Sequence, residues 1–88
     1  MKYSVEVVRI FYNDKAVIEQ KQQTEQFFDS LDIALISYNS SIIGERVTGE
    51  AHSYRGSSNI DVSLYVYTDE GMIMLESTFI HNGEVQHE

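Results

Sequence analysis

Residues 60–80 read IDVSLYVYTDEGMIMLESTFI, and this stretch decides the fold. Apolar residues occupy the even positions from 60 to 66, a period of two that is typical of a strand with one buried face. Asp69-Glu70-Gly71 then predicts a hairpin loop of about three residues, with Gly71 at a positive φ. The chain returns as a second strand over residues 72–80. We expect the buried face of this hairpin to carry Ile60, Val62, Leu64, Val66, Ile73, Leu75 and Phe79.

The N-terminal part predicts two more strands. Residues 2–12, KYSVEVVRIFY, place Tyr3, Val5, Val7 and Phe11 on one face, with Arg9 as the exception. Asn13-Asp14 is a favourable turn pair, and residues 15–21, KAVIEQK, are expected to pair back on the first strand. The segment KAVIEQKQQ is also compatible with a helix.

The middle of the chain predicts a helix over about residues 25–39, with Thr24 as its N-cap. Its evidence is an apolar stripe at a period of 3.6, formed by Phe27, Phe28, Leu31, Ala34, Leu35 and Tyr38. Residues 45–55, ERVTGEAHSYR, alternate weakly and predict an edge strand with Gly49 at a bulge. Asn82-Gly83 predicts a turn before a short last strand at residues 84–86.

These elements predict one α+β domain over residues 1–88, in the order ββαβββ. We expect a mostly antiparallel sheet of about five strands with one helix packed on one face, since this arrangement buries both apolar surfaces. The 88-residue length supports a single domain with a thin core.

The charge of the chain is uneven. It has 14 acidic and 6 basic residues and a net charge of −8. Arg55 is the last base, so residues 56–88 carry six acids and no Lys or Arg. Such a balance argues against binding to nucleic acid or anionic membranes, which requires basic patches. It favours a basic protein partner, or simply solubility.

No motif predicts catalysis, a cofactor or a metal. His52 and Ser53 are adjacent and would point to opposite faces of a strand, so they cannot act as a pair. His81, Glu84, His87 and Glu88 have no recognised ligand spacing, and we expect a solvated tail there. We therefore expect no enzyme, no metal and no cofactor. The N-terminal segment lacks the pattern of a secretory signal, which predicts a cytoplasmic location.

The outward face of the C-terminal hairpin is the candidate binding surface. Tyr and Met are enriched in interface centres, and acidic rims suit a basic partner. The predicted partner-binding residues are Asp61, Tyr65, Tyr67, Asp69, Glu70, Met74 and Glu76. They predict a small acidic protein-binding module that covers a basic, nucleic-acid-binding surface of a larger protein and so acts as a stoichiometric inhibitor. Acidic, cysteine-free phage inhibitors of restriction and CRISPR nucleases share this size and charge, without any shared motif.

Two alternatives stay open at this point. The chain could be a structural or assembly subunit, most simply a homodimer joined through the hairpin face or an exposed strand edge, because a thin core gains stability from oligomerisation. An enzyme or a small-ligand carrier is the least favoured interpretation. Plain packing of the hairpin face against the N-terminal strands would leave no binding surface there.

Overall fold

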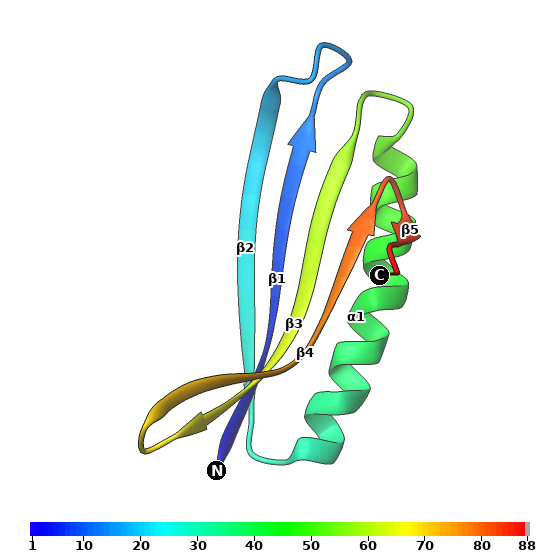
Figure 1. Ribbon diagram of the computed structural model, residues 1–88. Coiled ribbons are helices and arrows are strands. Elements are labelled where there is room, and N and C mark those ends of the chain that lie inside the picture. Colours follow the sequence, from blue (N-terminus) through cyan, green and yellow to red (C-terminus); the bar gives the residue numbers. More distant parts are fainter. Residues whose placement is uncertain (88) are drawn as a thin grey trace.

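The computed structural model describes residues 1–87 and folds them into one antiparallel sheet with a helix across one face (Figure 1). The strand order in the sheet is β2-β1-β3-β4-β5. The predicted α+β class and the ββαβββ order are therefore confirmed for this part of the chain. The elements are β1 (Lys2–Tyr12), β2 (Ile18–Phe28), α1 (Leu31–His52), β3 (Ser58–Thr68), β4 (Gly71–His81) and β5 (Glu84–Val85).

The core lies between α1 and the two central strands, β1 and β3. Antiparallel pairing places Val5 opposite Leu64 and Val7 opposite Val62, so the apolar faces of both strands point to the helix. The predicted burial of the even positions of β3 is confirmed. The core cluster comprises Val5, Val7, Ala34, Tyr38, Ile60, Val62, Leu64 and Ile80.

The second strand and the helix both lie further along the chain than predicted. The predicted strand at residues 15–21 is instead β2, which runs through Thr24 to Phe28. The predicted N-cap Thr24 is therefore wrong, and Ser30 precedes the helix in an extended conformation. Almost every side chain of β2 is exposed, so its sequence IEQKQQTEQFF has no need of apolar alternation.

The predicted edge strand at residues 45–55 is wrong, because α1 continues to His52. The helix turns Glu45 and Gly49 toward the sheet, where an apolar residue would be expected. Gly49 is not at a bulge but at a close approach. A Cβ atom there would lie 2.8 Å from the backbone nitrogen of Gly83, in the turn between β4 and β5.

The hairpin of β3 and β4 is confirmed, with Thr68 opposite Gly71 and Gly71 at a φ of +125°. The predicted buried face of β4 is wrong. A bulge lies between Leu64 and Tyr65, so the alternation of β4 changes phase along the strand. Ile80, opposite Ile60, is fully buried, whereas the predicted core residues are partly exposed: Ile73, Leu75 and Phe79.

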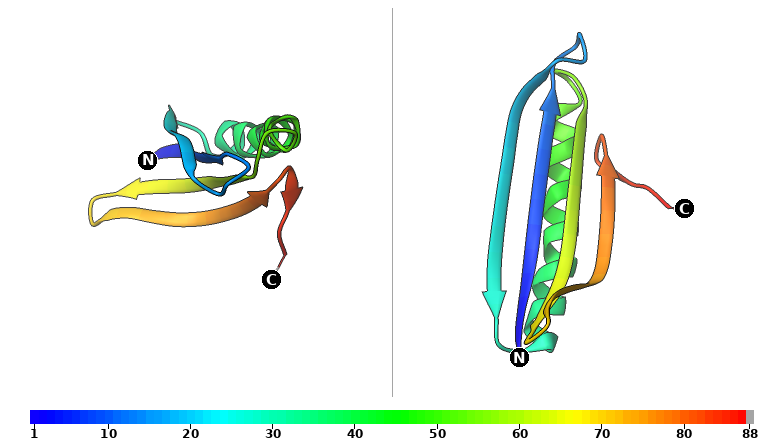
Figure 2. Two further views of the ribbon diagram at one scale, coloured as in Figure 1. Left: turned by 90° about the horizontal axis from the view of Figure 1, so that it is seen from above. Right: turned by 60° about the vertical axis from the view of Figure 1, so that its left-hand side comes forward.

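The closed end of this hairpin bends away from α1. Figures 1 and 2 show it crossing to the side of β1 and β2 that lies opposite the helix. There the ring of Tyr67 lies 5.8 Å from that of Phe27 at the end of β2. The bend explains why Ile73 stays exposed although it pairs with Val66 on the helix side of the sheet. The predicted last turn and strand are confirmed as Asn82-Gly83 and β5.

Candidate functional site

The candidate site is the face of the sheet that points away from α1, which we call the outer face. Its cross-strand rows follow from the strand registers. The one helix in residues 1–87 lies on the other side of the sheet (Figure 2). The rows are Lys2, Tyr67 and Met72; Phe27, Ser4, Tyr65 and Met74; Glu25, Glu6, Ser63 and Ser77; and Gln23, Val8, Asp61 and Phe79.

Hydrogen bonds organise the end of the outer face nearest the hairpin turn. The carboxylate of Glu25 accepts one hydrogen bond from the hydroxyl of Ser4 and one from the phenol of Tyr67, both at 2.9 Å. The bond to Glu25 raises the pKa of the Tyr67 phenol, because it stabilises the protonated form. Lys2 Nζ lies 5.5 Å from the centre of the Phe27 ring. This end is therefore a cluster of aromatic rings around a carboxylate whose partners are already in place.

The environment of Asp61, in the middle of the outer face, differs from that of Glu25. Its neighbours in the adjacent strands are Val8 and Phe79, both apolar. Burial raises the pKa of the Asp61 carboxyl, and no charge or hydrogen bond from residues 1–87 offsets that effect. The Asp61 side chain is exposed at the surface, yet its carboxylate is partly desolvated and has no compensating partner within residues 1–87.

The structure brings most of the predicted partner-binding residues together. Asp61, Tyr65, Tyr67 and Met74 share the outer face, with Tyr65 opposite Met74. Asp69 and Glu70 form the exposed turn at the end of the hairpin.

Glu76 is the exception among the predicted residues. It pairs with Leu64, whose side chain is in the core, so Glu76 belongs to the helix side of the sheet. The bulge next to Leu64 causes this change of face, and no residue pattern in the sequence predicts the bulge.

Sequence reasoning missed the contributions of β1 and β2 to the outer face. Glu6, Val8 and Glu25 lie beside the hairpin residues because β1 pairs with both β2 and β3. The alternation of residues 8–12 on the second face of β1 was a signal that this face is not simply solvated. Phe79 was missed because its predicted face depended on an unbroken β4 register.

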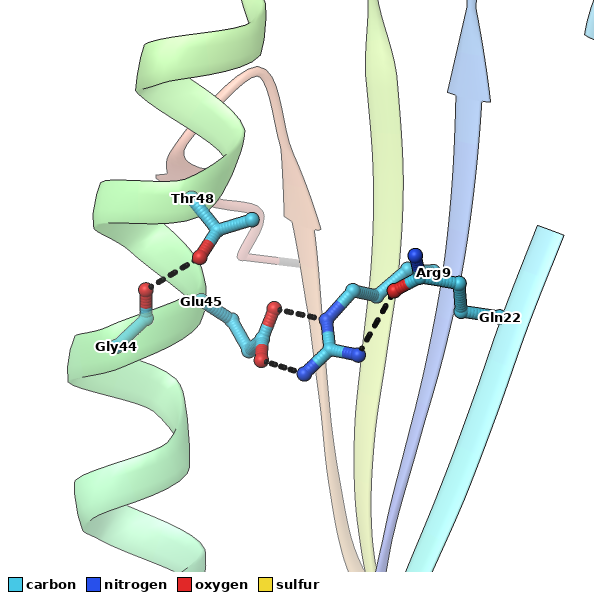
Figure 3. A network of polar contacts seen from close by, with 5 residues as sticks. All are labelled: Arg9, Gln22, Gly44, Glu45 and Thr48. Atoms are coloured by element: carbon cyan, nitrogen blue, oxygen red, sulfur yellow. Dashed lines mark hydrogen bonds and ion pairs between the residues drawn. The ribbon is translucent and has the colours of Figure 1, made fainter. Parts of the chain in front are cut away.

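The helix side of the sheet holds a second polar group of residues (Figure 3). Arg9 Nε and Nη2 donate to the two carboxylate oxygens of Glu45 at 2.7 and 2.5 Å, and Nη1 donates to Gln22 Oε1 at 3.2 Å. The hydrogen bonds to Glu45 raise the pKa of Arg9. This bidentate pair joins α1 to β1 and accounts for the single charged residue on the buried face of β1.

A cavity of about 640 Å³ lies beyond that pair, between the C-terminal end of α1 and the start of β2. His52 Nε2 is 2.8 Å from the carbonyl oxygen of Tyr12, and its ring packs 4.8 Å from the ring of Phe11. Arg55, at the rim, lies 3.8 Å from Glu19. His52 and Arg55 therefore each contact another group of the described chain, which is a structural role.

Three negative findings concern metal sites, membrane-spanning helices and similar proteins. No group of three or more His, Asp or Glu side chains within residues 1–87 could hold a metal ion. Within residues 1–87 the structure describes one helix, α1, and this helix is not apolar enough to cross a membrane. Comparison with protein families, with curated proteins and with solved structures finds no match to this chain.

Proposed function

We propose that the protein is an acidic binding module whose outer face docks on a basic surface of another protein. One observation carries this proposal: the carboxylate of Asp61 lies between Val8 and Phe79 on a sheet face that α1 does not cover, partly desolvated and without a partner within residues 1–87. A Lys or Arg side chain from another protein would provide the missing counter-charge and lower the pKa of Asp61 again.

The surroundings of Asp61 support a protein partner. Tyr65, Tyr67, Met72 and Met74 provide the aromatic and flexible apolar side chains that are enriched in interface centres. The turn residues Asp69 and Glu70 add exposed negative charge at the rim, which would steer a basic surface into place. The net charge of −8 acts in the same direction over a longer range.

The same negative charges favour a partner that normally binds nucleic acid. Surfaces that bind the phosphate backbone of nucleic acids present clustered Lys and Arg side chains. The protein would occupy such a surface with carboxylates in place of phosphates and act as a stoichiometric inhibitor. A nuclease of a restriction or CRISPR system would be a target of this kind.

A charge-reversal pair tests the proposal. Asp61→Lys is expected to lose the partner, because it places a positive charge at the centre of the outer face. Glu76→Lys makes the same change of charge on the opposite face of the same hairpin and is expected to retain the partner. The measurement is affinity capture from a lysate with each variant, followed by mass spectrometry and by elution with competing duplex DNA.

Comparing the two lysine variants shows whether the outer face selects the partner. A partner retained equally by wild type and Asp61→Lys, or lost equally with both lysine variants, would show that the outer face does not select it. A partner that duplex DNA cannot displace would retain the binding module but exclude the nucleic-acid site as its target. Far-ultraviolet circular dichroism of both variants would verify that each is folded.

A further inference from the structure

The helix carries a second apolar surface that the fold does not use. Ala34, Tyr38, Glu45 and Gly49 face the sheet and are buried. On the opposite side of α1, four β-branched apolar side chains remain between 56 and 68% exposed. We call these residues the solvent stripe: Ile33, Ile36, Ile43 and Val47.

The spacing of the solvent stripe is that of a helix-pairing seam. Positions 33, 36, 40, 43 and 47 follow one another at intervals of three, four, three and four residues. This is the a/d repeat by which two helices pack side by side, and it spans roughly 21 Å of helix at 1.5 Å per residue. Ser40 occupies the central position, and Gly44 lies next to it. A single solvated helix has no need of such a seam.

We propose that the solvent stripe binds a second copy of this chain, with the two helices antiparallel across a twofold axis near Ser40. Charge identifies this occupant. Asp32 and Arg46 are both exposed and lie on the same side of the stripe, 14 residues apart. An antiparallel pair places Asp32 against the partner's Arg46, and symmetry repeats this contact at the other end.

Other arrangements fit the helix less well. A parallel pair would set Asp32 against the partner's Ser37 and Arg46 against the partner's Ala51, so it would form neither charge pair. Within one chain the two residues are about 21 Å apart along the helix and cannot pair. The crossing point also suits close approach, because no atom lies within 4 Å of the position that a Cβ of Gly44 would take.

The dimer leaves the outer face free. Because α1 lies on the other side of the sheet, a helix-to-helix dimer turns the two outer faces away from each other (Figure 2). Each dimer would then present two copies of that face. This geometry does not depend on the function proposed for the outer face.

Sedimentation analysis of the full chain tests the dimer. Wild type is expected to dimerise in the micromolar range, and Ile36→Lys is expected to raise the dissociation constant at least about tenfold, since it places two charges in the apolar seam. Val17→Lys is the matched control. Val17 is a β-branched apolar residue that is 58% exposed and lies outside α1, and its replacement gives the same change of charge. It should leave the dimer unchanged.

Charge exchange tests the antiparallel orientation. Asp32→Arg and Arg46→Asp should each weaken the homodimer, because each creates two like-charge contacts. Their equimolar mixture should form a heterodimer, and the double variant should recover the homodimer. Arg46 also donates to the carbonyl oxygen of Gly83 at 3.4 Å, so the double variant separates the loss of that contact from the loss of the interchain pair.

Three results would overturn the proposal. The first is a wild-type chain that stays monomeric at several hundred micromolar. The second is a dimer that survives Ile36→Lys but is lost with Met74→Lys, which would place the contact on β4. The third is a homodimer that neither single charge variant weakens, which would refute the antiparallel arrangement.

Discussion

Arg9 and Glu45 show how a single ion pair can set the position of the helix. Their side chains are 21 and 9% exposed, so the pair is mostly buried between α1 and β1 (Figure 3). We expect Glu45→Gln to lower the free energy of unfolding by about 2 kcal/mol, below the roughly 3–5 kcal/mol typical of fully buried pairs, because Arg9 can still reach water. Urea unfolding measures this change.

The matched control for Glu45→Gln lies five residues further along the same helix. Glu50→Gln makes the same chemical change at an exposed position and should shift the free energy of unfolding by less than about 0.5 kcal/mol. Equal effects of the two variants would show that the contact with Arg9 contributes nothing to stability.

Asp61 connects stability with the proposed function. Burial raises its pKa above the ordinary value of 3.8, so the folded state binds a proton more readily than the unfolded state. Stability therefore falls as pH rises from about 3.8 through the raised folded pKa, and the penalty persists above it. Asp61→Asn should stabilise the protein at pH 7, by less than about 1 kcal/mol because the side chain is largely solvated, and the gain should vanish below pH 3.8.

Thermal unfolding of Asp61→Asn as a function of pH would measure this effect. Glu70→Gln, in the exposed turn, gives the contribution of net charge alone. A gain for Asp61→Asn that equals that of Glu70→Gln at every pH would refute local desolvation. A stabilising variant that also loses the partner would identify Asp61 as a residue kept for binding at a cost in stability.

The two glycines of α1 show how one element can contain opposite constraints. Gly44 faces open space, whereas a Cβ at Gly49 would meet backbone atoms of Gly83 at 2.8 and 3.2 Å. Gly44→Ala should raise the free energy of unfolding by about 0.5–1 kcal/mol through helix propensity. Gly49→Ala should lower it by about 1–3 kcal/mol, since the turn between β4 and β5 must move. Chemical unfolding at one low protein concentration compares both. A gain for both alanines would contradict the close approach at Gly83.

The same helix shows what the sequence could predict and what it could not. The apolar period from Leu31 to Tyr38 correctly placed a helix in the middle of the chain. Its second half went unrecognised because the sheet-facing positions are Glu45 and Gly49, one needed for Arg9 and the other for Gly83. Both are tertiary requirements that local periodicity cannot reveal.

Strands β3 and β4 also combine features that the sequence predicts with features that it does not. Alternation and turn chemistry correctly predicted the hairpin, the buried face of β3 and the shared face of Asp61, Tyr65, Tyr67 and Met74. The bulge beside Leu64 depends on how the sheet coils, and it moved Glu76 to the helix side. The companions of Asp61 from β1 and β2 depend on strand order, which a single sequence does not specify.

The whole molecule combines a net charge of −8 with two surfaces of different chemistry, and salt should distinguish them. Copies of this chain repel each other, so salt that screens the repulsion should tighten the helix-to-helix dimer. The exposed pair of Asp32 with the partner's Arg46 opposes this trend by only about 0–1 kcal/mol per contact. A basic partner on the outer face is attracted by the same charge, so salt should weaken that complex.

The measurement is a pair of titrations from about 0.05 to 0.5 M sodium chloride, over which the screening length falls from roughly 14 to 4 Å. Sedimentation follows the dimer, and surface-based binding follows the complex with the captured partner. The dimer dissociation constant should fall several-fold while that of the complex rises by at least about tenfold. A dimer that weakens with salt as steeply as the complex would mean that opposite-charge contacts, rather than the apolar stripe, hold the two copies together.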